Sequence, residues 1–317
     1  VAEKEGVRVR ILDAEGNGVV PEFGVNDAGE FGDNPTVALL DDGKFVVAWE
    51  TFFDRNDPYV RTIVFRVFNA DGTAASEEIV ASQTQTDEHR AADITVLENG
   101  AFAIAWSSKD VDVYQPFPSF TPIITRSPGV VKSAIFNADG TRVVDDFSLS
   151  ATSDEFGQES VTISALPGGG FMAVWRDTTN YENFDVGGIK ARSFDNLGQE
   201  VMPETLVSPN TEGHQGSPEV AVNLDGSFVV IWYSLNLADE DGLSYLRASV
   251  FNSDGSVAVN EFNIMSTTQQ TYGGMFGTVE YLSNGQFVVV WNDYENETSF
   301  YMDVFARIYH ADGSAAS

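Results

Sequence analysis

The sequence predicts an all-β fold, a β-propeller of about five four-stranded antiparallel blades closed by pairing of its N- and C-terminal strands. The first marker is a tryptophan that ends an apolar phrase such as "DDGKFVVAW", at Trp49, Trp106, Trp175, Trp232 and Trp291, with spacings of 57, 69, 57 and 59 residues. The second is a turn glycine, at Gly16, Gly72, Gly140, Gly198, Gly255 and Gly313, with spacings of 56, 68, 58, 57 and 58 residues. Because two independent markers share one period, the repeat is a structural unit.

One repeat, residues 36–82, shows how each element arises. "TVALL" predicts a short strand, and "DDG" predicts an Asp-Gly hairpin turn, which tolerates positive φ. "FVVAW" is apolar on both faces, as expected of a central strand that is buried on both sides. After a polar loop, "TIVFRVF" alternates, "NADG" turns the chain, and "SEEIVAS" predicts a more polar last strand. No segment of the chain shows a convincing helical periodicity.

Four strands per repeat match one propeller blade. We expect a single repeat domain over 1–317, with approximate units 1–26 (partial), 27–82, 83–151, 152–208, 209–265 and 266–317 (partial). An N-terminal strand that completes the C-terminal blade would hide both sheet edges. We count about 21 strands, one more than five four-stranded blades use. An open fragment of a longer array and a sixth, incomplete blade are therefore alternatives.

The composition excludes several classes of function. The formal net charge of −31 repels nucleic acids and anionic membranes, and it favours solubility and divalent cations. The chain has no cysteine, which removes disulfides, thiolate zinc sites and thiol nucleophiles. No apolar run approaches the roughly 20 residues of a membrane helix. The sequence begins at Val1 without a signal peptide, and we expect it to be a piece of a longer protein.

The repeats resemble those of very large surface proteins of proteobacteria, which are exported by type I secretion and many of which carry RTX repeats. The resemblance rests on phrases such as "DGSFVVIW" followed by "FNSDG", and it extends over the five "FVVxW" phrases and the "xADG" turns. It implies a secreted or cell-surface location and a role in adhesion. The glycine-rich calcium-binding nonapeptide of RTX proteins is absent, so that mechanism of calcium binding is not implied.

The "NADG" turns have two interpretations. Asn69 and Asp71 offer oxygen atoms to calcium, but one turn supplies two or three ligands, whereas calcium takes six to eight. Asn, Asp and Gly are also the residues that a tight turn requires. We therefore expect a structural turn. We expect structural ion pairs or carbonyl contacts from the arginines that recur before these turns, Arg10, Arg66, Arg192, Arg247 and Arg307.

The loops that follow the tryptophan strands occupy equivalent positions, so in a propeller they gather on one face. Their carboxylates suit a hard cation. The predicted calcium ligands are Asp110, Asp112, Asp239 and Asp241. An ordinary solvated acidic loop would have the same composition.

The same loops are rich in aromatic residues, which bind the faces of sugars when they are exposed beside carboxylates and amides. The predicted ligand-binding residues are Tyr114, Phe117, Tyr181, Tyr233, Tyr245, Tyr294 and Tyr301. Packing of the loops on one another is the alternative. The longest loop, Val111–Val130, contains four prolines and has no counterpart in the other units, which marks it as a candidate specificity element.

No motif for catalysis is present: we find no nucleophile elbow, phosphate-binding loop, zinc-type histidine spacing or Ser/His/Asp order. The sequence therefore favours a monomeric, non-catalytic extracellular module that binds a glycan or a cell-surface or matrix partner, with calcium stabilising its loops. A propeller glycoside hydrolase or polysaccharide lyase is the alternative, because two of the 48 carboxylates would suffice for that chemistry. A structural spacer is the second alternative.

Overall fold

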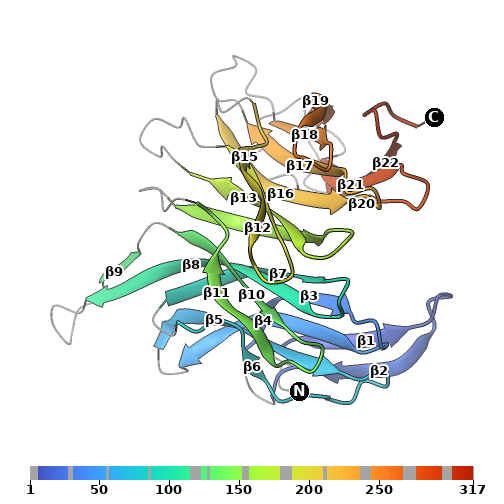
Figure 1. Cartoon of the computed structure of the whole chain (residues 1–317). Coiled ribbons are helices and arrows are strands. Elements are labelled where there is room, and N and C mark those ends of the chain that lie inside the picture. The colour runs from blue at the N-terminus through green and yellow to red at the C-terminus, as the bar shows by residue number, and fades with distance from the viewer. Residues whose placement is uncertain are drawn as a thin grey trace. The chain divides into compact units, whose positions relative to one another are not determined.

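The computed structural model describes residues 6–27, 31–54, 57–84, 87–114, 123–126, 129–151, 157–178, 188–209, 213–235, 244–266, 276–294 and 302–316. All secondary structure in this part of the chain is β, and all strand pairs are antiparallel (Figure 1). The chain divides into two compact units, Val1–Leu149 and Ser150–Ser317.

The first unit contains three sheets. A two-stranded sheet pairs β1 (Arg8–Leu12) with β2 (Gly18–Gly24). A four-stranded sheet has the order β3 (Asp33–Leu39), β4 (Phe45–Asp54), β5 (Asp57–Phe68) and β6 (Ile79–Val80). The next sheet has the order β7 (Asp87–Val96), β8 (Phe102–Tyr114), β10 (Val130–Phe136) and β11 (Arg142–Ser148). Within the long insertion, β9 (Ile123–Arg126) pairs with β8.

The second unit also contains three sheets. One has the order β12 (Gln158–Ala165), β13 (Phe171–Asp177), β14 (Ile189–Phe194) and β15 (Glu200–Leu206). The next has the order β16 (His214–Val222), β17 (Phe228–Leu235), β18 (Ser244–Phe251) and β19 (Val257–Ser266). The last has three strands, β20 (Gly277–Tyr281), β21 (Phe287–Tyr294) and β22 (Met302–Tyr309).

The repeat predicted from the sequence is visible in the strand order. Apart from β9, the described residues form four sheets of four strands, one of three and one of two, which is the expected total of about 21. In sequence pattern, β1 and β2 correspond to the third and fourth strands of a complete sheet. The strands β20, β21 and β22 correspond to the first, second and third. Closure through pairing of these two terminal sheets stays a prediction.

The tryptophan strand is the second strand of its sheet in every case, as the apolar phrase predicted. Four of the five tryptophans are completely buried, and Trp291 is nearly so. The first residue of this strand pairs with the last residue of the third strand, and the two rings stack. The five stacked pairs are Phe45–Phe68, Phe102–Phe136, Phe171–Phe194, Phe228–Phe251 and Phe287–Tyr309, with ring centroids 4.9–5.6 Å apart.

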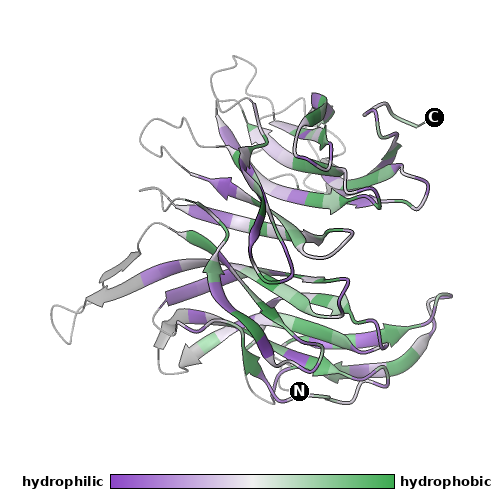
Figure 2. Cartoon of the chain, in the orientation of Figure 1, coloured by the Kyte–Doolittle hydropathy of each residue, from purple (hydrophilic) through white to green (hydrophobic). Residues whose placement is uncertain are grey.

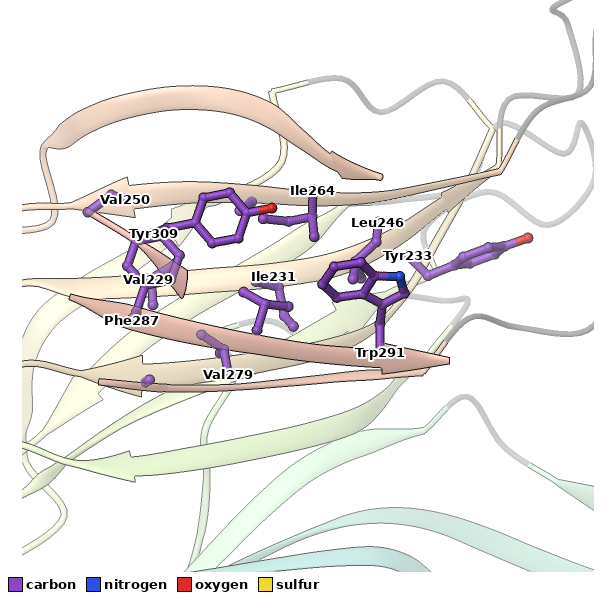
Figure 3. Packing of buried hydrophobic residues seen from close by; sticks show 13 residues of the cluster. Val229, Ile231, Tyr233, Leu246, Val250, Ile264, Val279, Phe287, Trp291 and Tyr309 are labelled. Atoms are coloured by element: carbon purple, nitrogen blue, oxygen red, sulfur yellow. The ribbon is translucent and has the colours of Figure 1, made fainter. Parts of the chain in front are cut away.

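Hydrophobic residues line the strands (Figure 2) and form continuous cores between neighbouring sheets of a unit. Figure 3 shows one core of the second unit, where residues of β17 and β18 pack against residues of β20, β21 and β22. Trp291 and Leu246 lie side by side in this core, and the Tyr233 ring points toward one end of it. Burial of the tryptophan strand on both faces therefore holds neighbouring sheets together.

The repeated pentapeptide is a structural turn, as expected. In each such turn the glycine N–H donates to the carbonyl three residues earlier, and each turn glycine has φ between 73° and 87°. In "FNADG", Asp71 Oδ1 accepts hydrogen bonds from the Thr73 N–H and hydroxyl at 2.9 and 2.6 Å. These hydrogen bonds lower the pKa of Asp71, and Asp139, Asp254 and Asp312 repeat the arrangement. The Asp oxygen is thus used by the turn itself.

Three of the five recurrent arginines make the structural contacts expected of them. Arg66 donates to the Val25 carbonyl at 2.9 Å and pairs with Asp27. Arg192 pairs with Glu200, and Arg247 pairs with Glu261. These contacts join a third strand to its own fourth strand or to the neighbouring sheet.

Candidate functional site

The two ends of each sheet differ in chemistry. Because neighbouring strands are antiparallel, the tight turns between first and second strands and between third and fourth strands lie at one end, which we call the turn end. The segments that follow the tryptophan strands, and the connections from one sheet to the next, leave from the opposite end, which we call the loop end. The aspartates of the repeated turns are engaged in the turns, so the loop end is the better candidate for a functional site.

Buried polar side chains recur at the loop end of one sheet of the first unit and of two sheets of the second unit. Two residues after each tryptophan, Ser108, Asp177 and Ser234 pair across the sheet with His89, Gln158 and Gln215 on the first strand, respectively. A cation on the third strand, Lys132, Lys190 or Arg247, lies opposite the tryptophan. All six residues of these three cross-strand pairs are buried. The apolar core therefore ends in a repeated polar layer at this end.

In the first unit this end carries a cluster around Arg61, which we call the Arg61 cluster (Phe31, Asp33, Glu50, Phe52 and Arg61). Arg61 Nη1 lies 2.9 Å from Glu50 Oε2 and 3.4 Å from Asp33 Oδ2. Its guanidinium carbon lies 5.1 and 5.5 Å from the centroids of the Phe31 and Phe52 rings. The Glu50 side chain is only 1% exposed, whereas that of Asp33 is 49% exposed. The cluster thus joins a buried carboxylate, an arginine and two aromatic rings to a carboxylate that solvent reaches.

Glu50 also connects neighbouring sheets. Its Oε1 accepts hydrogen bonds from the Asn34 side-chain amide and from the Ala91 N–H on β7, both at 2.9 Å. Asn34 and Ala91 occupy bulges of their strands with φ of 45° and 53°. Ser160 and Ser217 have positive φ at equivalent bulges of β12 and β16. A charge-assisted hydrogen bond therefore stabilises an otherwise unfavourable backbone conformation at Ala91.

The second sheet of the first unit contains a buried histidine in this layer. His89 Nε2 donates to the Thr84 carbonyl at 2.9 Å, and its ring meets the Trp106 ring edge-on with centroids 6.0 Å apart. Burial lowers the pKa of His89. Asp87 accepts a hydrogen bond from Ser108 at 3.2 Å and lies 3.5 Å from the Lys132 ammonium.

The second unit carries a partly buried lysine between two carboxylates. Lys190 pairs with Asp177, which is fully buried, and its ammonium lies 2.9 Å from Glu204. Burial by itself lowers the pKa of Lys190, but the hydrogen bonds to Asp177 and Glu204 outweigh it, so the pKa lies above its usual value. The Ala151 N–H donates to the second Glu204 oxygen at 2.8 Å. Lys190 thus joins two carboxylates at this end of the sheet, whereas Asp177 Oδ1 has no hydrogen-bond partner among the described residues.

A third polar group connects two sheets of the second unit. Arg176, directly after Trp175, pairs with Glu159 at 2.9 Å. His214 lies near both, and burial and the Arg176 charge lower its pKa. The His214 ring also meets the Tyr233 ring, with centroids 6.0 Å apart.

Two of the predicted ligand-binding residues are described in full. Tyr233 is 5% exposed, its hydroxyl lies 3.0 Å from the Ser244 hydroxyl, and burial raises its pKa. Tyr245, on β18, is partly buried, and the Arg247 guanidinium lies over its ring at 4.9 Å. Both tyrosines belong to the loop end of one sheet. Their roles in binding stay predictions.

Of the other predicted site residues, Asp110 is exposed on β8, where it pairs with Asp87 of β7. Asp112 and Tyr114 lie further along β8, and Tyr294 ends β21. Phe117, Tyr181, Asp239, Asp241 and Tyr301 lie outside the described residues. In the described part of the chain, no group of three or more His, Cys, Asp or Glu residues is placed to hold a metal ion. The calcium sites therefore stay predictions.

The Arg61 cluster was not predicted from the sequence. One signal was available, because Glu50 is a charged residue directly after the buried strand "FVVAW". A carboxylate at the end of an otherwise apolar strand requires a partner. Its partners come from three other strands, so the sequence does not identify them.

No family model and no curated protein match the sequence. A protein of unknown function from Dyadobacter fermentans is similar in structure, with a TM-score of 0.58 and 12% identity over 100% of this chain and 86% of that one. A structure described as NanB plus Optactamide has a TM-score of 0.59 and 9% identity, over 92% of this chain and 61% of that one. A thermostable family-43 glycoside hydrolase has a TM-score of 0.48 and 11% identity, over 92% of this chain and 96% of that one.

These identities are low, so the likeness is one of fold. In the described residues no helix is present that could cross a membrane. The all-β composition, the antiparallel sheets of four strands and the propeller structures among the similar proteins lead to one conclusion: the chain has the β-propeller fold that its repeats predicted, with about five to six blades.

Proposed function

We propose that the protein is a non-catalytic, extracellular glycan-binding module and that its binding surface is the loop end of its sheets. The observation that carries the proposal is the Arg61 cluster, where an arginine lies over two aromatic rings and pairs with a half-exposed carboxylate. Carboxylates and guanidinium groups bind hydroxyl groups, and aromatic rings pack against the apolar faces of sugars. The cluster therefore combines both kinds of contact at one position.

The charge of the chain narrows the glycan class. A net charge of −31 repels polyanionic glycans over the whole surface. Neutral glycans meet no such barrier, and their hydroxyl groups suit Asp33. Neutral glycans are therefore the class that we propose.

A glycan array probed with the labelled 317-residue chain tests the proposal. We expect binding to neutral glycans, and we expect Asp33→Asn to weaken it, because the half-exposed carboxylate loses its charge. Asp42→Asn is the matched control, because Asp42 is also exposed but lies at the turn end of the same sheet. Absence of any neutral-glycan signal, or equal binding by the two variants, would contradict the proposal.

A propeller glycoside hydrolase or lyase is the second candidate, and one observation favours it. Asp33 and Glu50 both contact Arg61 Nη1, so their nearest oxygens lie no more than about 6 Å apart, which permits the separation of about 5–5.5 Å that a retaining pair of carboxylates requires. Against it, Glu50 is buried and already accepts three hydrogen bonds. Release of reducing sugar from a glycan that the array identifies would favour the enzyme, whereas binding without release would favour the module.

We also propose that the protein binds calcium. The acidic composition and the predicted ligands Asp110 and Asp112 support a site at the end of β8, where the strand enters the long insertion. We expect calcium to raise the melting temperature and EDTA to lower it. Identical melting curves with calcium and with EDTA would rule out a stabilising site.

A further inference from the structure

One lysine of the second unit contacts carboxylates from both neighbouring strands. Lys190 is on β14, the third strand of the order β12-β13-β14-β15, and it pairs with Trp175 on β13 and with Leu206 on β15. Asp177, two residues after Trp175, forms an ion pair with Lys190. Glu204, two residues before Leu206, places an oxygen 2.9 Å from Lys190 Nζ. An amine and two carboxyl groups therefore meet at the loop end of one sheet.

The three side chains are buried to different degrees. Asp177 is completely buried, whereas the side chains of Lys190 and Glu204 are 21% and 16% exposed. Asp177 Oδ1 is buried and has no hydrogen-bond partner among the described residues. A buried, ionised carboxylate with an oxygen in this state is costly. A reaction that removes the charge and one of the two oxygens would remove this cost.

Formation of an amide between Lys190 and Asp177 is such a reaction. The two groups are on adjacent, hydrogen-bonded strands, so the fold holds the amine against the carboxyl group. Contact of this kind makes the condensation intramolecular, which favours it strongly. The burial of Asp177 also keeps bulk water away from the product, which opposes hydrolysis of the amide.

The condensation needs no other reactant. One proton of the Lys190 ammonium passes to Glu204, and the neutral amine attacks Asp177 Cγ. The C–N bond forms. As the C–O bond to one Asp177 oxygen breaks, that oxygen receives the proton from Glu204 and a second proton from the nitrogen, and it leaves as water. Glu204 returns to its ionised form, and no group is oxidised or reduced.

Glu204 is held where this proton transfer requires it. A group that transfers a proton must be within hydrogen-bond reach of it, and Glu204 Oε1 lies 2.9 Å from Lys190 Nζ. The second Glu204 oxygen accepts a hydrogen bond from the Ala151 N–H at 2.8 Å. This hydrogen bond fixes the carboxylate, so Glu204 is placed to act as the proton carrier.

The first unit contains a similar lysine that lacks one part of this arrangement. Lys132 pairs with the tryptophan of its sheet, as Lys190 does, and its ammonium lies 3.5 Å from Asp87. Asp146 has the strand position of Glu204, but its carboxylate pairs with an arginine of its own strand at 2.9 Å. The second carboxylate is thus engaged elsewhere, and we expect Lys132 to remain an ordinary ion-pair partner.

We propose that Lys190 and Asp177 are joined by an intramolecular isopeptide bond, which forms with Glu204 as the proton carrier. The ion pair between Lys190 and Asp177 is the state before the reaction. The bond links β13 to β14 covalently at the loop end. Because the chain has no cysteine, it can form no disulfide, and the amide is a covalent cross-link that does not depend on redox conditions.

Mass spectrometry of the folded 317-residue chain tests the proposal without any variant. We expect an intact mass that is one water, about 18 Da, below the mass of the sequence. Trypsin cleaves after arginine and after unmodified lysine, so the cross-linked chain should give the peptide 177–192 as a ring that has lost one water. Fragment ions should place the bond at Asp177. An unchanged mass together with cleavage after Lys190 would overturn the proposal.

Variants separate this bond from other losses of water. Lys190→Arg keeps the positive charge but forms no amide of this kind, so its mass should equal that of its sequence. A loss of water that persists in Lys190→Arg would indicate a succinimide at an Asp-Gly turn and would overturn the proposal. Asp177→Asn should lose ammonia, about 17 Da, in place of water. Lys132→Arg is the matched control and should keep the loss of one water.

The role of Glu204 has its own test. In Glu204→Gln the bond should form about a hundredfold more slowly or less, measured as the growth of the lighter mass with time after synthesis. Circular dichroism shows whether the variant is folded. Formation of the bond at the unchanged rate in Glu204→Gln would overturn the assignment of Glu204 as the proton carrier.

Discussion

Gly72 of the repeated "FNADG" turn offers a quantitative test of how the sheets pack. It has φ of +82°, and a Cβ atom at this position would lie 2.9 Å from Phe23 Cε1 and 3.1 Å from Val20 Cγ1, on β2 of the neighbouring sheet. Gly43 lies in the other turn of the same sheet, with φ of +81° and no atom within 4 Å of a built Cβ. A side chain at either glycine would therefore meet the same backbone strain, but only at Gly72 would it also meet atoms of the neighbouring sheet.

The expected magnitudes follow from this difference. Ala in the left-handed region costs about 1–2 kcal/mol at either position, offset in part by the lower entropy of the unfolded chain. Gly72→Ala must also displace Phe23 or Val20, and overpacking of this kind costs about 1–3 kcal/mol. We therefore expect Gly72→Ala to be less stable than Gly43→Ala by about 1–3 kcal/mol, because the strain cancels in the comparison.

Urea unfolding followed by tryptophan fluorescence measures this difference. Trp49 and Trp106 report on the first unit because both are buried there. Gly72→Ala should lower the free energy of unfolding of the first unit by more than Gly43→Ala does. Equal losses would refute the reasoning, because they would show that the turn does not pack on β2.

Three other variants test the polar layer. Glu50→Gln should lower the free energy of unfolding by about 1.5–3 kcal/mol in urea titrations, because the Arg61 guanidinium and the Ala91 N–H lose a charged acceptor. An unchanged free energy of unfolding would mean that the charge of Glu50 does not contribute to stability. Lys190→Met should cost about 3–5 kcal/mol in the same assay, because Asp177 is left buried without its cation. For His89, burial lowers the pKa, so the folded state binds its proton less readily than the unfolded state, and stability is lost as the pH falls below the usual value of 6.5. His89→Gln, which matches Gln158 and Gln215, should flatten that part of the pH profile, and an unchanged profile would contradict this assignment.

Local patterns predicted the repeating parts of this fold. The turns follow from "NADG" because Asp and Gly satisfy the hydrogen bonds and the φ values of a tight turn within five residues. The tryptophan strands follow from "FVVAW" because a strand that is apolar on both faces must be buried on both. Neither prediction required knowledge of distant contacts.

The candidate site could be predicted only in part. The sequence predicted that functional groups gather after the tryptophan strands, and the structure places Tyr233 and Tyr245 at the loop end. It did not show that the Tyr233 ring is buried against its own sheet, because burial of a residue next to a loop depends on the neighbouring strands. Nor did it identify Arg61, whose partners Asp33 and Glu50 are 28 and 11 residues away.

By itself, the sequence determined the all-β class, the period, the turns and the buried strand of each sheet, since these depend on residues close together in the chain. The tertiary structure decided which side chains meet at the loop end and that Glu50 joins two sheets. The physical reason is that such contacts join residues from different strands. Their distances depend on strand register and on the packing of sheets, and no local pattern specifies either.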